Sequence, residues 1–132
     1  MAASSAGLHE DERKLKPGTI DRHRAIVSIM EELEAVDWYD QRADAAGDEE
    51  LKGILAHNRD EEKEHAVMTL EWLRRHDSKL DEHLRTYLFK DQSPLQVEVD
   101  QKKQEVGLSA EPKSKAGSGD GSLGIGSLRE GK

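Results

Sequence analysis

The sequence predicts an all-α protein: two long antiparallel helices and a short C-terminal helix, which a second copy of the chain completes to a four-helix bundle. Residues 20–46 contain neither Pro nor Gly, and their apolar side chains recur at helical spacing. Residues 49–76 repeat the pattern after a Gly47-Asp48 turn. Only 34% of the 132 residues are hydrophobic, and none is cysteine. One chain therefore has a small core without disulfides, and it needs metal or partner chains for stability.

The helical region is expected to span residues 20–91. Residues 1–19 are polar and are predicted to form a flexible arm, after which Thr19 or Asp21 caps the first helix. A short third helix is expected over 78–89, ending before Ser93-Pro94. The apolar positions of the two long helices are Ile26, Ile29, Met30, Leu33 and Val36, and Leu51, Ile54, Leu55, Leu70 and Leu73.

Residues 92–132 differ in composition from the helical region. Residues 92–119 are charged, rich in Ser and Gly and almost free of aromatics, which predicts a disordered linker. Residues 120–132 contain the apolar island SLGIGSL, in which Leu123, Ile125 and Leu128 alternate with small residues. This pattern suits an extended peptide that docks on another protein, and chance hydrophobicity in a frayed tail is the alternative. The Gly-rich run lacks the Lys-Ser/Thr ending of a phosphate loop.

Charge and hydropathy exclude several classes of protein. The net charge of −8 and the lack of a basic stripe argue against nucleic-acid binding. No apolar stretch approaches the roughly 20 residues that span a bilayer, and the N-terminal residues do not resemble a signal peptide. We therefore expect a cytoplasmic protein.

Two carboxylates occupy unexpected positions on the long helices. On a helical wheel, Glu62 falls near the centre of the apolar stripe of the second helix, with His65 to one side. Glu32 falls among the apolar residues of the first helix. Burying an unpaired ionised carboxylate costs several kcal/mol, which a bound cation would offset. A solvated face is the alternative, because Glu-x-x-His often occurs by chance in acidic helices.

Carboxylate oxygens with one imidazole nitrogen suit iron or manganese, and less selectively zinc. Di-iron carboxylate bundles take one Glu from each of two helices and one Glu-x-x-His from each of the other two. Glu32, with Glu62 and His65, supplies half of that set. Two chains packed as an isologous dimer would complete both the site and the core.

Other polar and aromatic residues of the first helix allow two interpretations. Glu31, Glu34 and Trp38 are either a solvated face with one exposed aromatic or a second oligomer interface whose acids attract cations. Tyr39 lies close to the Glu32 line, where it could hydrogen-bond a metal ligand or simply pack in the core.

Four segments together resemble a known family: HRAIVSIMEELEAVDWYDQRADA, LAHNRDEEKEHAVMTLEWLRR, HLRTYLF and GSLGIGSL. They closely resemble the encapsulated ferritins, the truncated ferritin-like cargo proteins of encapsulin nanocompartments. The resemblance covers most of residues 20–90 and the tail. The helical motif and the terminal peptide are independent signals that agree.

The resemblance implies a ferritin-like antiparallel dimer, a ring-shaped decamer, and a di-iron ferroxidase centre at each dimer interface, with iron (Fe2+/Fe3+) as the metal. The family's metal ligands match Glu32, Glu62 and His65. Its metal-uptake residues match Glu31, Glu34 and Trp38, and the tyrosine beside its centre matches Tyr39. Its shell-docking peptide matches Leu123, Gly124, Ile125, Gly126, Ser127 and Leu128, so residues 120–132 would target the chain to the inside of an encapsulin shell.

The expected activity is oxidation of Fe(II) to Fe(III), with the iron stored in the shell. Two alternatives stay open. One is a peroxidase of rubrerythrin type, and the other is a non-catalytic helical cargo protein whose metal is structural.

Overall fold

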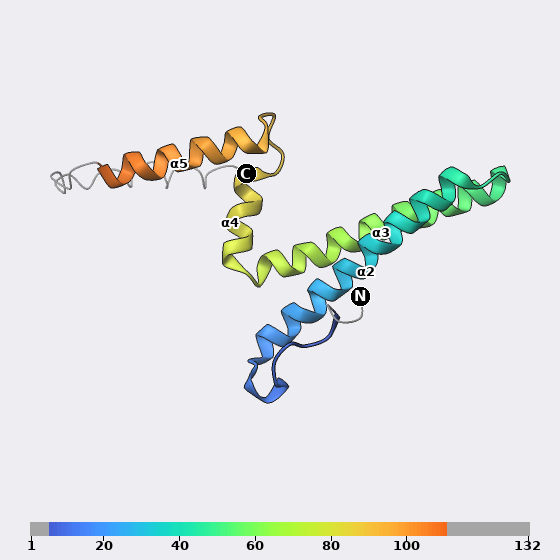
Figure 1. Cartoon of the computed structure of the whole chain (residues 1–132), viewed down its shortest axis with the longest axis horizontal. Helices are drawn as coiled ribbons and strands as arrows, with labels where there is room; N and C mark the ends of the chain where they lie inside the picture. The colour runs from blue at the N-terminus through green and yellow to red at the C-terminus, as the bar shows by residue number, and fades with distance from the viewer. Residues whose placement is uncertain (1–5, 111–132) are drawn as a thin grey trace, which may run out of the picture. The chain divides into compact units, whose positions relative to one another are not determined.

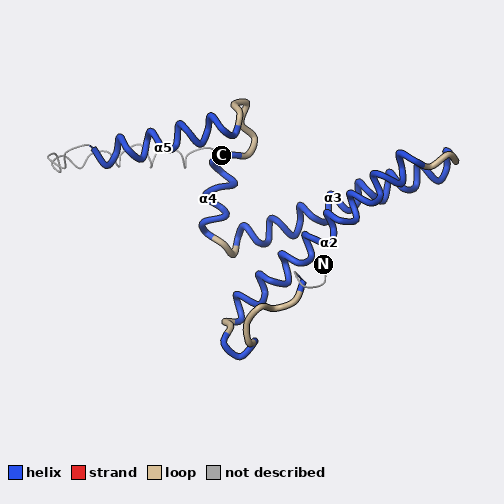
Figure 2. The backbone as a smooth tube through the Cα atoms, viewed as in Figure 1, coloured by secondary structure: helices blue, strands red, loops and turns tan. Residues whose placement is uncertain are grey.

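The computed structural model describes residues 6–110, and of residues 108–110 only the backbone. Its elements are a 3₁₀ turn η1 (Glu12–Lys14) and the helices α2 (Pro17–Ala45), α3 (Glu49–Arg75), α4 (Ser78–Tyr87) and α5 (Pro94–Ala110) (Figure 1). Within this range there is no strand, which confirms the all-α class (Figure 2). The chain divides into two units, Met1–Leu88 and Phe89–Lys132.

Helix α2 begins earlier than the sequence predicted. Pro17 occupies the first helical turn, where its fixed φ suits a helix and its missing N–H is not needed. Lys16 stands at the N-cap in extended conformation without a capping side chain, so the prediction that Thr19 or Asp21 caps the helix was wrong. The predicted flexible arm is also wrong for residues 12–14, which form η1, and for residues 17–19, which belong to α2.

Helix α3 begins at the predicted turn. The N–H of Leu51 donates to Asp48 Oδ2 at 2.8 Å, so Asp48 caps the helix. Acidic residues occupy the first turn of α3 and basic residues its last turn, which complements the helix dipole. Residues 46–48 connect α2 to α3, and the two helices lie side by side as an antiparallel hairpin (Figure 1).

The hairpin buries few large side chains. Its buried apolar residues are Ala25, Ala43, Ala66 and Leu73. Several large residues of the predicted apolar stripes are instead exposed: Ile26, Met30, Leu33, Leu51 and Ile54. Val67 and Met68 of α3 are 63% and 64% exposed. Small residues let the helices approach closely, but half of the predicted apolar stripe positions stay exposed within the single chain.

A network of ion pairs holds the junction of α3 and α4. The Arg74 guanidinium donates to both carboxylate oxygens of Glu71 at 2.7 Å and also to Asp81 of α4. Arg75 donates to Glu71 at 2.6 Å, and Arg85 donates to Asp81 at 2.9 Å. The hydrogen bonds from Arg74 and then Arg75 lower the pKa of Glu71 to about 2. The direction in which the chain leaves α3 therefore depends on charge as well as on packing.

Helix α4 ends at Tyr87, two residues before the predicted end. Phe89 follows with φ of 59° and a fully exposed side chain. A left-handed φ is uncommon for a residue with a bulky side chain, and it interrupts the helical path.

The predicted disordered linker over residues 92–119 is wrong for residues 94–110, which form α5. The N–H of Leu95 donates to Ser93 Oγ at 3.3 Å at the start of the helix. Along it, Gln96 donates to Asp100 at 2.9 Å, and Lys102 lies 3.8 Å from Glu98, both at i,i+4. The charges that suggested a linker therefore also support a helix. Residues 111–119 lie outside the described residues.

None of the helices within residues 6–110 is long and apolar enough to cross a bilayer.

Glu71 is expected to stabilise the fold only while it is ionised. Because folding lowers its pKa from 4.5 to about 2, its contribution is present above pH 4.5 and is lost as the pH falls toward 2. The variant Glu71→Gln should therefore have a lower free energy of unfolding than the unmodified chain at pH 7, and this difference should shrink below pH 4.5. Urea unfolding at a series of pH values and one protein concentration measures it.

The matched control is Glu64→Gln. Glu64 is an exposed carboxylate on the same helix and has no ion pair among the described residues. Its substitution should change stability little at any of these pH values. A Glu71→Gln difference that stays constant between pH 7 and pH 3 would contradict the role of this network.

Candidate metal centre

Glu32 is a carboxylate without a hydrogen-bond partner in the middle of α2. Its Oε2 atom is buried and accepts no hydrogen bond from the described residues. Burial raises the pKa of Glu32; the charge of His65 acts to lower it, and the charges of Glu62 and Glu31 raise it further. Glu62 and His65 belong to α3, and the effect of their charges on Glu32 indicates that they lie near it across the hairpin.

Glu62 and His65 form a pair on α3. His65 Nδ1 lies 3.6 Å from Glu62 Oε2, and the two side chains are 47% and 27% exposed respectively. The i,i+3 spacing puts them on one face of the helix, as predicted. This pair presents one oxygen donor and one nitrogen donor on the same side.

The three predicted ligands are therefore only partly brought together. Glu62 and His65 are in contact, and Glu32 is near enough for their charges to affect its pKa. Within residues 6–110, no three or more His, Cys, Asp or Glu side chains are grouped closely enough to hold a metal ion. Carboxylate oxygens with an imidazole nitrogen nevertheless match the donors that iron accepts, and the buried Glu32 oxygen has no other partner.

Trp38 and Tyr39 of α2 contact the Arg42 side chain, which the sequence analysis did not predict. The guanidinium carbon of Arg42 lies 5.9 Å from the ring centre of Trp38 and 5.7 Å from that of Tyr39. These are cation–π distances, and the i,i+4 and i,i+3 spacings in the sequence could have indicated them. No hydrogen bond joins Tyr39 to Glu32 in the described part of the chain, and both interpretations of Tyr39 stay open.

The predicted metal-uptake residues lie on the accessible side of α2. Glu31, Glu34 and Trp38 are exposed, and Trp38 retains 49% of its surface. The charge of Glu31 contributes to the raised pKa of Glu32. The predicted docking peptide, Leu123–Leu128, lies outside the described residues.

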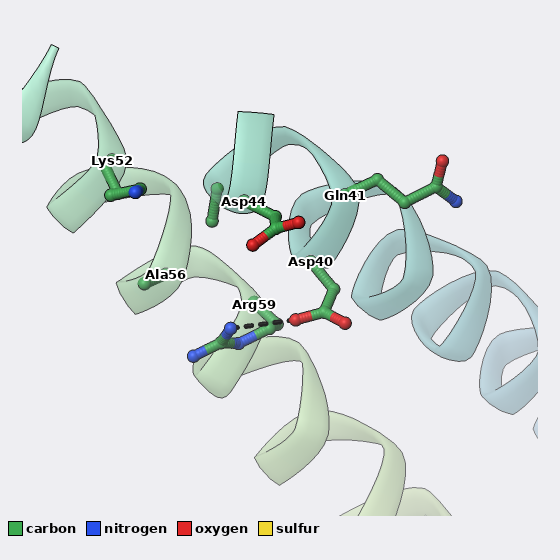
Figure 3. Close-up of a pocket in the computed structure, with 7 residues that line it drawn as sticks. Asp40, Gln41, Asp44, Lys52, Ala56 and Arg59 are labelled. Atoms are coloured by element: carbon green, nitrogen blue, oxygen red, sulfur yellow. Dashed lines mark hydrogen bonds and ion pairs between the residues drawn. The ribbon is translucent and has the colours of Figure 1, made fainter. Parts of the chain in front are cut away.

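An open hollow lies near the tip of the hairpin (Figure 3). None of the three candidate ligands, Glu32, Glu62 and His65, lines it. Asp40 and Asp44 line it from α2, and Lys52 and Arg59 line it from α3. Arg59 Nη1 donates to Asp40 Oδ1 at 2.9 Å across the hollow (Figure 3). Sequence analysis did not predict this contact, because nothing in the sequence pairs residues so far apart.

Comparison with known proteins gives consistent similarities. Residues 7–91 match the model of a family described as EncFtn-like. An encapsulated ferritin-like protein of Rhodospirillum rubrum is 60% identical over 129 residues, which cover 98% of this chain and 92% of that protein. A ferritin-like protein of Thermotoga maritima is 51% identical over 90 residues, which cover 68% of this chain and 79% of that protein. The crystal structure of the Nitrosomonas europaea protein ne0167 superposes with a TM-score of 0.64 at 57% identity, covering 66% of this chain and 96% of that one.

Glu32 is expected to destabilise the metal-free chain at neutral pH. Its pKa is raised by burial, so the ionised form that predominates at higher pH is the disfavoured form in the fold. The variant Glu32→Gln removes this charge at similar volume and should raise the free energy of unfolding at pH 7. Urea unfolding with chelator present measures the change. The same substitution at the exposed Glu34 should have little effect, and an equal or lower stability of Glu32→Gln would contradict the expectation.

Proposed function

Because the chain belongs to the EncFtn-like family, we propose that it oxidises Fe(II) to Fe(III) at a two-iron centre shared by two copies of the chain. The iron is then stored inside an encapsulin shell to which the chain is bound as cargo. The observation that carries this proposal is the buried Glu32 Oε2 atom, which has no hydrogen-bond partner among the described residues and lies near the Glu62–His65 pair. A buried polar atom without a hydrogen bond is unfavourable unless a ligand binds it.

The second copy is proposed because one hairpin supplies too few donors and too little core. Its large apolar side chains are exposed along α2 and α3, and its buried residues are mostly alanine. An isologous pairing would bury these side chains and bring a second set of three ligands to the same axis. The dimer, and a ring-shaped decamer built from it, are parts of this proposal.

Two iron ions in one site can together supply the two electrons that an oxidant such as oxygen or peroxide accepts. The residues of this chain bind and orient the metal. Glu62 and Glu32 would offer oxygen donors to the iron, and His65 would offer a nitrogen donor. Exposed Glu31 and Glu34, with Trp38 beside them, would attract Fe(II) toward the site.

Replacement of the α3 ligands should abolish rapid iron oxidation. Glu62→Ala and His65→Ala each remove a donor from both halves of the proposed shared site. After aerobic addition of Fe(II), the absorbance of ferric product should rise only at the rate of the protein-free control. Unchanged oxidation rates in both variants would refute the site assignment. Glu50→Ala, an exposed carboxylate in the first turn of α3, should keep the rate of the unmodified chain.

The same assay separates the alternatives. Peroxide consumption without oxygen uptake would favour a peroxidase, and bound metal without oxidation would favour a structural metal. Metal content compared with oligomer mass adds an independent test, because a shared two-iron site requires about one iron per chain in even-numbered assemblies.

Residues 120–132 are proposed to dock the chain on the shell. Support comes from the encapsulated relative, whose similarity extends over 98% of this chain. Deletion of these residues should leave iron oxidation intact and abolish co-purification with a co-expressed encapsulin shell protein. Retained co-purification would refute the docking role, and lost oxidation would show that the tail does more than dock.

A further inference from the structure

Few large side chains are buried where α2 packs against α3. The buried residues at this interface are three alanines and one leucine, Leu73. Large side chains that interlock would resist sliding, but among the described residues of the two helices Leu73 is the only large apolar residue that is buried. A polar contact between the helices can therefore add to the alignment that the short connection of residues 46–48 and the half-buried side chains provide.

The ion pair between Arg59 and Asp40 is such a contact. It joins α3 to α2 with Arg59 Nη1 and Asp40 Oδ1 2.9 Å apart (Figure 3). No other side-chain hydrogen bond or ion pair links α2 to α3 among residues 6–110.

Neighbouring residues on α3 hold the Arg59 side chain in place. Its Nε donates to Asp60 Oδ1 at 3.0 Å, and Lys63 Nζ lies 3.2 Å from the same oxygen. The Arg59 side chain is only 25% exposed. The guanidinium therefore reaches across the hairpin from a fixed position, which suits a contact that selects one alignment.

The Arg59–Asp40 pair lies on the same two helices as the candidate ligands, between them and the hairpin tip. Asp40 lies about 12 Å from Glu32 along α2, toward the hairpin tip. Arg59 lies about 4.5 Å from Glu62 and about 9 Å from His65 along α3, also toward the tip. A slip of one turn would move a ligand by about 5.4 Å, far more than a metal–ligand bond of about 2 Å tolerates.

We propose that Arg59 and Asp40 are positioning residues for the metal centre, which set the alignment of α2 against α3 that brings Glu32 opposite Glu62 and His65. Neither residue binds metal in this role. The inference rests on the proposed function, because it concerns the same three ligands. An exposed ion pair contributes little to overall stability, but a small preference between nearby alignments changes the fraction of chains competent to bind.

Metal binding to the full-length chain tests this role with Co2+ alone as the probe. Its visible absorption reports the ligand geometry, and its titration gives an affinity. Arg59→Gln and Asp40→Asn should each weaken Co2+ binding by about 10-fold, the effect typical of residues that orient metal ligands. The double variant should be no weaker than either single variant, because the contact is already lost. Arg59→Lys, which keeps the charge, should recover part of the affinity.

The matched control is Arg24→Gln, which removes an Arg–Asp pair of 2.7 Å within α2. It should leave the Co2+ affinity and spectrum unchanged. Circular dichroism of the metal-free variants should show the same helical signal and thermal midpoints within about 8 °C of the unmodified chain.

The outcomes separate this proposal from the proposed function. Single variants that bind Co2+ as tightly as the unmodified chain would overturn the positioning role alone, as would losses that add in the double variant. Failure of the unmodified chain to bind Co2+ would overturn the shared metal site and the positioning role together.

Discussion

A buried carboxylate oxygen without a hydrogen-bond partner among the described residues, in a hairpin with very little core, is the constraint on which the rest of this structure depends. Glu32 Oε2 lies out of contact with water and without a hydrogen bond in the described part of the chain, and burial raises the pKa of its carboxyl group. A hairpin that buries three alanines and a leucine has little stability to offset this cost. The unfavourable Glu32 carboxylate lies near Glu62 and His65, which is expected of a site that a bound ligand completes.

The small size of the buried residues links packing to the site. Alanine at positions 25, 43 and 66 lets α2 and α3 approach closely, so side chains of one helix can influence those of the other. Because the buried residues are small, the larger apolar residues stay accessible to the surface of another protein chain. Polar contacts therefore supplement the apolar packing between helices. The Arg59–Asp40 pair links the two long helices, and Arg74 links α3 to α4.

Much of the helical structure could be predicted from local pattern. The Gly47-Asp48 turn, the Asp48 cap and the extent of α3 follow from short-range chemistry, and the helical spacing puts Glu62 and His65 on one face. The predictions of secondary structure were wrong where the same residues suit both a helix and an irregular segment. Charged residues 94–110 look like a solvated linker, yet their i,i+4 partners also suit a solvated helix. Pro17 looks like a helix breaker, although it is well suited to a first turn.

The sequence by itself determined the helices and the faces on which the candidate ligands lie, because both depend on interactions between residues three or four positions apart. It also determined, through its low apolar content, that one chain has a small core. Only the tertiary structure decided that Glu32 Oε2 is buried without a hydrogen-bond partner among the described residues, and that Arg59 reaches Asp40. Burial and the contacts between helices depend on how α2 lies against α3, and no local pattern encodes that arrangement.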